Sequence, residues 1–136
     1  MKIEGACHCG EIKYEAEVSA EKVMVCHCAD CQTFSGSAFR VIVWVDESNI
    51  KFPSGKPFEY VKIAESGNKR AQGFCRNCGT GLYATSADEK RSRVYGLRVG
   101  TTRQRDQLVP KRQIWLRSRQ RWLSNLDSLP GTEKQQ

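Results

Sequence analysis

Seven cysteines lie in three short clusters along the 136-residue chain. The clusters are Cys7-His8-Cys9, Cys26-His27-Cys28-Ala29-Asp30-Cys31 and Cys75-Arg76-Asn77-Cys78. Disulfide bridges within a cluster would be strained at these spacings, and an odd number of thiols would leave one unpaired. Cysteine pairs separated by one or two residues are typical of metal knuckles. The pattern therefore predicts metal ligation by thiolates.

A glycine follows the second cysteine of the first and third clusters, as Cys9-Gly10 and Cys78-Gly79. It permits the sharp turn that aims backbone amides at sulfur. We therefore assign one tetrahedral zinc site to four cysteines, Cys7, Cys9, Cys75 and Cys78. Four thiolates satisfy zinc completely, so this site is expected to be structural. Zinc binding of about 10–16 kcal/mol rivals the stability of a whole domain, so loss of the metal should unfold the protein.

Cys26, Cys28 and Cys31 remain, three ligands within six residues. A metal held by three protein ligands keeps one position for water or substrate, where it acts as a Lewis acid. Because all three ligands are thiolates, the site is soft and should accept the thiol of a sulfur-containing substrate as readily as water. Two alternatives stay open: a second structural zinc completed by Asp30, His27 or a partner chain, and a redox trio of free thiols.

The histidines inside the clusters are poor ligand candidates. Alternate side chains of an extended segment face the same way, so His8 and His27 point away from a metal held by their flanking cysteines. His27 and Asp30 border the open position of the second site, where either could shuttle a proton. A solvated side chain is the preferred interpretation for both.

Short alternating or apolar segments predict a mostly β fold that must position these clusters. The expected strands are residues 3–7, 11–18, 22–25, 39–45, 50–52, 58–63, 70–74, 81–84, 94–99 and 113–116. In the second of them Ile12, Tyr14, Ala16 and Val18 share one face. Residues 28–37 are compatible with one or two helical turns. The expected role of six aromatic residues is core and hairpin packing rather than a binding platform: Trp44, Trp115, Trp122, Phe39, Phe58 and Phe74.

Length and composition predict one domain over residues 1–123, followed by a flexible polar tail over 124–136. The longest apolar run, residues 41–45, is far too short to cross a membrane, so no membrane partner is expected. The first residues do not read as a secretory signal, and a cytoplasmic protein is expected. The sequence does not fix the oligomeric state.

The positive charge gathers in one part of the chain. Lys and Arg number 22 against 15 Asp and Glu, and residues 98–121 carry eight bases against Asp106 alone. Such a surface attracts anions. It could be a solvated face, a site for a small anionic substrate, or a nucleic-acid surface. The last is disfavoured because no aromatic residues interleave with the bases as a stacking platform.

Three motifs carry a family resemblance: residues 5–10 (GACHCG), 26–37 (CHCADCQTFSGS) and 74–80 (FCRNCGT). In order and spacing the chain resembles the glutathione-dependent formaldehyde-activating enzyme family, also called the centromere protein V family, over roughly residues 3–123. The resemblance implies a β-tent of packed antiparallel sheets and two zinc ions per chain, on the cysteine sets given above. It also implies a carbon–sulfur lyase that reversibly adds the sulfur of glutathione to formaldehyde. Thr102-Arg103 and Gln113 depart from the family's usual residues, which leaves the substrate open.

The mechanism expected from this resemblance places the substrate thiol at the fourth position of the zinc on Cys26, Cys28 and Cys31, which we take as the catalytic residues. Arginines of residues 98–121 would bind the carboxylates of glutathione or a related acidic thiol, because a guanidinium fork matches a carboxylate. The rival function is a non-catalytic zinc-stabilised module that binds nucleic acid or an acidic partner through the same basic segment.

Overall fold

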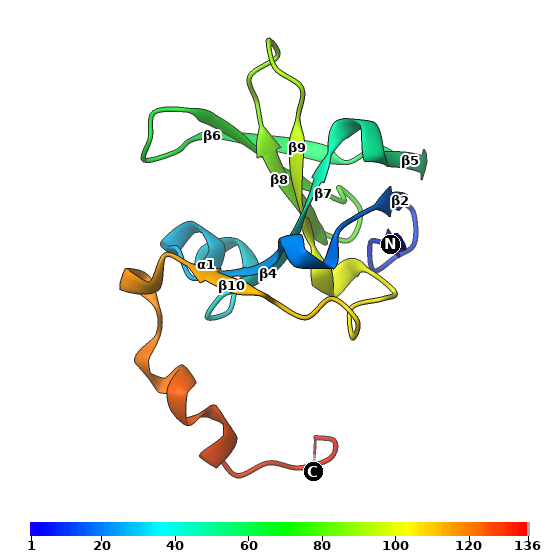
Figure 1. Ribbon diagram of the computed structural model, residues 1–136. Coiled ribbons are helices and arrows are strands. Elements are labelled where there is room, and N and C mark those ends of the chain that lie inside the picture. The colour runs from blue at the N-terminus through cyan, green and yellow to red at the C-terminus, as the bar shows by residue number, and fades with distance from the viewer. Residues whose placement is uncertain (136) are drawn as a thin grey trace.

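Two β-sheets form the framework of the computed structural model, which describes residues 1–135 (Figure 1). The smaller sheet has the order β1-β2-β5, with β1 at Lys2–Ala6, β2 at Lys13–Glu17 and β5 at Ile50–Ser54. Both of its strand pairs are antiparallel. The β1–β2 hairpin carries the first cysteine cluster in its turn, as the sequence predicts.

The larger sheet has seven strands in the order β10-β3-β4-β9-β8-β7-β6. Their bounds are β3 Val23–Cys26, β4 Arg40–Asp46, β6 Phe58–Ile63, β7 Lys69–Phe74, β8 Gly81–Ser86, β9 Val94–Arg98 and β10 Arg112–Ile114. Neighbours are antiparallel except β10, which pairs in parallel with β3. The predicted mostly β class is confirmed.

Helical segments are short. The α-helix α1 spans Ala29–Ser35 and ends at Gly36, whose φ of 64° lies in the left-handed region that glycine adopts without strain. The 3-10 turns are η1 Ala20–Lys22, η2 Glu47–Asn49, η3 Val99–Thr101, η4 Leu116–Ser118 and η5 Arg121–Ser128. The expected strand at 113–116 is shorter in the structure, because Trp115 has a φ of 60° and starts η4 after β10 ends at Ile114.

The hydrophobic core lies between one face of each sheet. The predicted alternation in β2 is confirmed, since Ile12, Tyr14, Ala16 and Val18 are all buried. They join Val43, Val45, Leu82, Tyr83, Tyr95 and Leu97 from the larger sheet in one cluster. Successive side chains of a strand point to opposite faces, so the other face of the larger sheet is left for different residues.

The pairing register of the strands determines which residues share this second face of the larger sheet. Cys26 pairs with Arg40 between β3 and β4, and Ile42 pairs with Arg98 between β4 and β9. Trp44, Gly96, Ala84 and Gln72 form one row across β4, β9, β8 and β7. Paired residues stand on the same face of a sheet. The face opposite the core therefore brings the second cysteine cluster and several polar side chains together.

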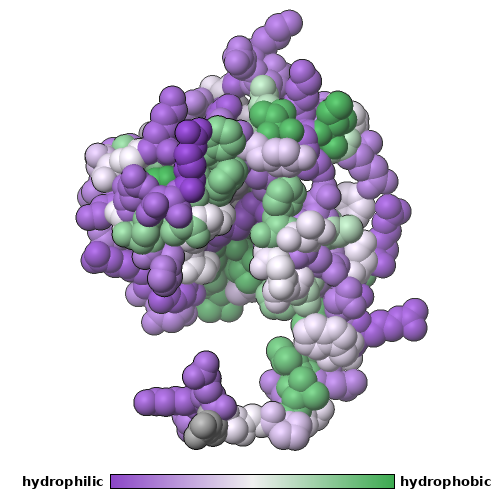
Figure 2. All heavy atoms as spheres, turned by 180° about the vertical axis from the view of Figure 1, so that it is seen from behind, coloured by the Kyte–Doolittle hydropathy of each residue, from purple (hydrophilic) through white to green (hydrophobic). Residues whose placement is uncertain are grey.

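The C-terminal segment leaves the body after β10 (Figure 1, orange to red). Trp115 and Trp122 are 42% and 49% exposed, so the expectation that they pack in the core or in a hairpin is wrong. Phe58 is 43% exposed but packs on Phe74 across the β6–β7 hairpin, with 5.4 Å between the ring centres, as expected. The two tryptophans belong to η4 and η5, and hydrophobic residues on the departing arm stand clear of the body in Figure 2. η5 crosses the expected boundary at residue 123, and the flexibility of residues 124–136 stays a prediction.

None of the helices in residues 1–135 is both long and apolar enough to cross a membrane.

Candidate functional site

The first and third cysteine clusters meet, although 66 residues separate Cys9 from Cys75. Cys7 and Cys9 lie in the β1–β2 turn, and Cys75 and Cys78 lie in the β7–β8 turn. Their four Sγ atoms all lie within 4.8 Å of one another, with 3.6 Å between Cys7 and Cys9 and 3.8 Å between Cys9 and Cys75. A zinc tetrahedron with Zn–S bonds of about 2.3 Å has sulfur–sulfur edges of about 3.8 Å. The four sulfurs therefore fit a tetrahedral metal ion.

Both turns have the glycine geometry that the sequence predicts. Gly10 and Gly79 have φ values of 81° and 77°. The Gly10 N–H donates to the Cys7 carbonyl at 3.0 Å, and the Gly79 N–H donates to the Cys75 carbonyl at 2.8 Å. The Cys7 sulfur also accepts the Ile12 N–H at 3.2 Å. Backbone donors that stabilise sulfur as thiolate are typical of a metal knuckle.

Cys26, Cys28 and Cys31 form the second group, called the trio below. Cys26 ends β3, Cys28 is the N-cap of α1, and Cys31 lies in the first turn of that helix. Their Sγ atoms lie within 4.8 Å of one another. Among residues 1–135 no fourth His, Cys, Asp or Glu side chain joins this group. The trio can hold a metal and leaves one ligand position for another molecule.

His27 and Asp30 do not complete the trio. His27 is buried, and its Nε2 lies 2.8 Å from Gln113 Oε1 on β10. The Gln32 side chain donates to the His27 carbonyl at 2.8 Å. The expectation of a solvated His27 is therefore wrong, because β10 covers it. Asp30 is exposed and forms an ion pair with Lys62 of β6.

The trio sulfurs have unequal proton affinities in the metal-free chain. Hydrogen bonding from Cys26, and after it the charge of Arg40, lower the pKa of Cys31 to about 5 against the opposing effect of burial. Burial raises the pKa of Cys28. Cys31 is therefore the first thiolate of the trio, and the thiolate is the form that binds metals.

A cavity of about 1480 Å³ opens over the trio and runs along the face of the larger sheet that is opposite the core. All three trio cysteines line it. Eight of its lining side chains are cationic and four are acidic. A site with this excess of positive charge attracts anions.

Two arginines of the cavity converge on one neutral acceptor. Arg40 Nη1 and Arg98 Nη2 donate to Gln72 Oε1 at 3.2 and 2.9 Å, and Arg98 Nη1 donates to the Gly96 carbonyl at 3.2 Å. Arg40 is only 8% exposed, and its Nε has no hydrogen-bond partner among the residues that the structure describes. Both guanidinium groups lie within hydrogen-bond distance of this one Gln72 oxygen, so their like charges repel each other.

Burial and the repulsion from Arg40 also lower the pKa values of two neighbouring arginines. Burial, and then the charge of Arg40, lower the pKa of Arg98 to about 9. The same two causes lower the pKa of Arg70, which lines the cavity on β7. Within the part of the chain that the structure describes, none of these three arginines has a carboxylate partner. The cavity therefore holds cations without internal counter-ions.

The basic segment 98–121 contributes less to this cavity than the sequence suggests. Only Arg98 and Arg117 of that segment line it, and Arg117 is 3.5 Å from Glu65. Sequence analysis missed Arg40, Arg70 and Gln72. On β7, Arg70 and Gln72 alternate with Ala71 and Gly73, which is a signal that the two polar residues share a face. Arg40 stands before the apolar run of β4 and gives no such signal, and the strand order that brings the three residues together is not visible in the sequence.

Comparison with known proteins gives a fold and a family. A protein of Rhodobacter sphaeroides with a known crystal structure has a TM-score of 0.59 and 20% identity, over 81% of this chain and 98% of that chain. An uncharacterized lyase of Schizosaccharomyces pombe is 34% identical over 80 residues, which are 59% of this chain and 55% of the relative. The chain thus matches about half the length of that lyase.

The family model for the glutathione-dependent formaldehyde-activating enzyme matches residues 2–118. That range contains both cysteine groups and the whole cavity. Together with a relative named as a lyase, it supports a glutathione-related, lyase-type function. The chain belongs to the glutathione-dependent formaldehyde-activating enzyme family.

Proposed function

We propose that this protein is a zinc-dependent carbon–sulfur lyase, which adds a small carbonyl such as formaldehyde to the sulfur of a small anionic thiol such as glutathione, and removes it again. The observation that carries the proposal is the trio, three sulfurs beside a cationic cavity that no fourth ligand from residues 1–135 joins. The family match supports glutathione as the type of thiol.

The two cysteine groups would have different tasks. Cys7, Cys9, Cys75 and Cys78 offer a complete tetrahedral shell, which suits a structural zinc ion. Cys26, Cys28 and Cys31 would hold a second zinc ion. A metal ion there supplies a Lewis acid that lowers the pKa of a thiol in its remaining position. The chain's own contribution is to hold the thiol and carbonyl together and to attract the anion.

The reaction forms one carbon–sulfur bond. The thiol sulfur attacks the carbonyl carbon, the carbonyl π electrons move to oxygen, and the proton lost from the thiol is taken up by that oxygen to give a hydroxymethyl thioether. The reverse reaction releases both components. No oxidant or reductant is needed, in agreement with a lyase and against a redox role for the trio thiols.

The test is Cys28→Ser in the full-length protein, with Thr33→Ala on the exposed side of α1 as the matched control. Cys28→Ser should lower bound zinc from two ions to one per chain, counted by native mass spectrometry, and abolish thiol-dependent consumption of formaldehyde. Thr33→Ala should retain both. Full turnover by Cys28→Ser would refute the proposal.

A second candidate function follows from the exposed arm. Trp115 and Trp122 are exposed among the bases Arg117, Arg119 and Arg121, and Arg117 lies 5.2 Å from the centre of the Trp115 ring. The sequence is expected to lack aromatic residues interleaved with the bases, but these exposed rings do lie among basic side chains, as they do on a nucleic-acid surface. Binding of single-stranded DNA that weakens steeply with salt and is lost in Trp122→Ala would favour it.

We also propose a reducing compartment such as the cytoplasm for this protein. The seven cysteines are free in the structure, and both proposed metal sites need their cysteines reduced.

A further inference from the structure

The part of the cavity next to the trio keeps an excess of positive charge even when the trio holds a divalent metal ion. Three thiolates and one divalent cation carry a single net negative charge, which one guanidinium balances. Arg40, next to Cys26 in the β3–β4 register, is placed to do so. Arg70 and Arg98 remain, and neither has a carboxylate partner in residues 1–135.

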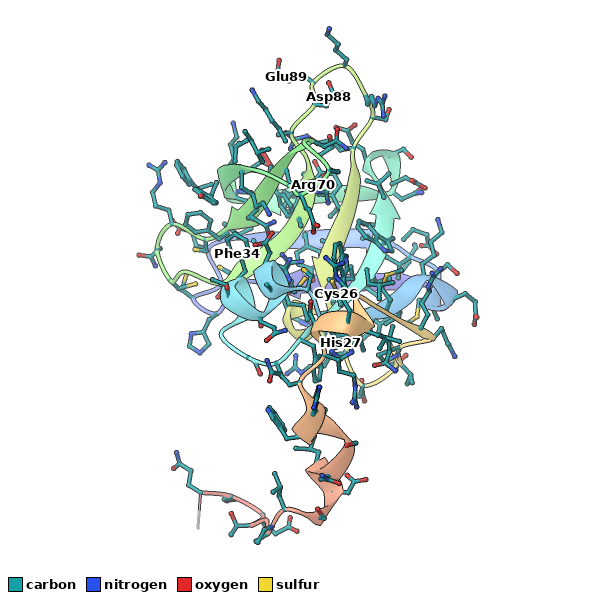
Figure 3. All side chains as sticks on the ribbon, turned by 90° about the vertical axis from the view of Figure 1, so that its left-hand side faces the viewer. Cys26, His27, Phe34, Arg70, Asp88 and Glu89 are labelled. Atoms are coloured by element: carbon teal, nitrogen blue, oxygen red, sulfur yellow. The ribbon has the colours of Figure 1, made fainter. Side chains whose placement is uncertain are left out.

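The acidic residues of the cavity do not neutralise these arginines. Asp30 pairs with Lys62, and Glu65 lies 3.5 Å from Arg117. Asp88 and Glu89 stand at the tip of the β8–β9 hairpin, well away from Cys26 (Figure 3). The missing counter-ion must therefore come from a ligand.

Gln72 shows that the fold keeps this charge uncompensated. A glutamate of the same size at that position would lie within hydrogen-bond distance of both Arg40 and Arg98, at 3.2 and 2.9 Å, and would form two ion pairs. The chain has a neutral carboxamide there instead. It holds both guanidinium groups in place and adds no negative charge, so the charge of Arg98 stays available, and so does the Nε of the buried Arg40, which has no partner in residues 1–135.

We infer that Arg40, Gln72 and Arg98 form the binding site for a carboxylate of the thiol substrate. This inference rests on the proposed function and assigns the recognition to residues of β4, β7 and β9 rather than to the basic C-terminal segment. The guanidinium groups would bind the carboxylate, and Gln72 is the positioning residue that holds them side by side. Arg40 is the register neighbour of Cys26 and lines the same cavity as the trio, so a carboxylate bound there would lie close to the sulfur held at the trio.

The test is Gln72→Glu, which supplies the missing counter-ion with almost no change of shape. Its matched control is Gln107→Glu, which adds the same charge at an exposed position outside the cavity. The zinc-loaded protein is titrated with S-methylglutathione, which keeps both carboxylates but cannot act as a thiol. We expect at least tenfold weaker binding in Gln72→Glu and unchanged binding in Gln107→Glu.

A second pair of variants removes charge instead of adding it. Arg98→Met should weaken S-methylglutathione at least tenfold, whereas Arg103→Met, which removes an exposed arginine paired with Glu4, should not. In turnover assays Gln72→Glu should raise the KM for glutathione at least tenfold. The KM for the neutral thiol 2-mercaptoethanol should stay within about twofold of its value in the unaltered protein. Thermal unfolding of each variant shows whether it is folded.

The outcomes separate this inference from the proposed function. If folded Gln72→Glu and Arg98→Met bind S-methylglutathione as tightly as the unaltered protein, the carboxylate site is refuted, whatever the activity. If the protein shows no thiol-dependent turnover but binds S-methylglutathione in a way that both variants abolish, the site stands and the proposed reaction fails. Equal loss of activity with glutathione and 2-mercaptoethanol in Gln72→Glu would also overturn the inference.

Discussion

Cys75→Ser should unfold this protein, whereas a cysteine-to-serine change in the trio should not. Cys75 is fully buried in the core and joins the β7–β8 turn to the β1–β2 turn. If four ligands share the roughly 10–16 kcal/mol of a structural zinc site equally, losing one costs about 3–4 kcal/mol. A buried serine hydroxyl without a partner adds about 1–3 kcal/mol. The expected loss of about 4–7 kcal/mol approaches the whole stability of a small domain, about 5–15 kcal/mol.

Cys28→Ser has a different expected cost because the trio spans only six residues. A metal there joins the end of β3 to the first turn of α1 and does not link distant segments. The Cys28 sulfur accepts the Cys31 N–H at 3.2 Å as the helix cap, and serine is a good N-cap residue. The free energy of unfolding should therefore fall by no more than about 1 kcal/mol.

The assay is thermal unfolding followed by circular dichroism, with zinc counted by native mass spectrometry on the same samples. Cys75→Ser should lower Tm by about 15–30 °C or prevent folding, and Cys28→Ser should lower it by less than about 5 °C. Each variant should lose one zinc ion. A Cys75→Ser protein with a Tm near that of the unaltered chain would refute the structural role of the four-cysteine site. An unfolded Cys28→Ser protein would refute the expectation that the trio stabilises only the segment around it.

Two further predictions concern the core. Gly73→Ala should destabilise the fold by about 1–3 kcal/mol, because its Cβ would overlap the ring of Tyr83, whereas Gly81→Ala, with open space around it, should not; urea unfolding distinguishes them. Burial raises the pKa of Tyr14 to about 12, so its stabilising contribution is complete below pH 10 and falls between pH 10 and 12, by up to about 3 kcal/mol. Stability that fell equally steeply with pH in Tyr14→Phe would count against that explanation.

The parts of the fold that depend on local pattern could be predicted from the sequence. The strands follow from short alternating segments, and both cysteine groups follow from spacing and from Gly10 and Gly79. The trio needs no long-range information, because its members lie within six residues.

The parts that depend on strand order could not be predicted. Arg40 and Gln72 are 32 residues apart and meet because β4, β9, β8 and β7 are neighbours in that order. The burial of His27 depends on β10, which lies 86 residues away. Trp115 and Trp122 look like core residues in the sequence, but they follow the last strand and leave the body with the arm.

The parallel pairing of β10 with β3 has a consequence for synthesis of the chain. His27 is covered by Gln113 and held by the Ile114 carbonyl, and both residues are made late. At about 5–20 residues per second, a ribosome needs roughly 4–17 s to add the 86 residues between His27 and Gln113. Once Cys78 has been added, the nascent protein has all seven thiols, yet the strand that closes over the segment of Cys26 and Cys28 does not exist. Metal could therefore enter the trio from this side before translation ends.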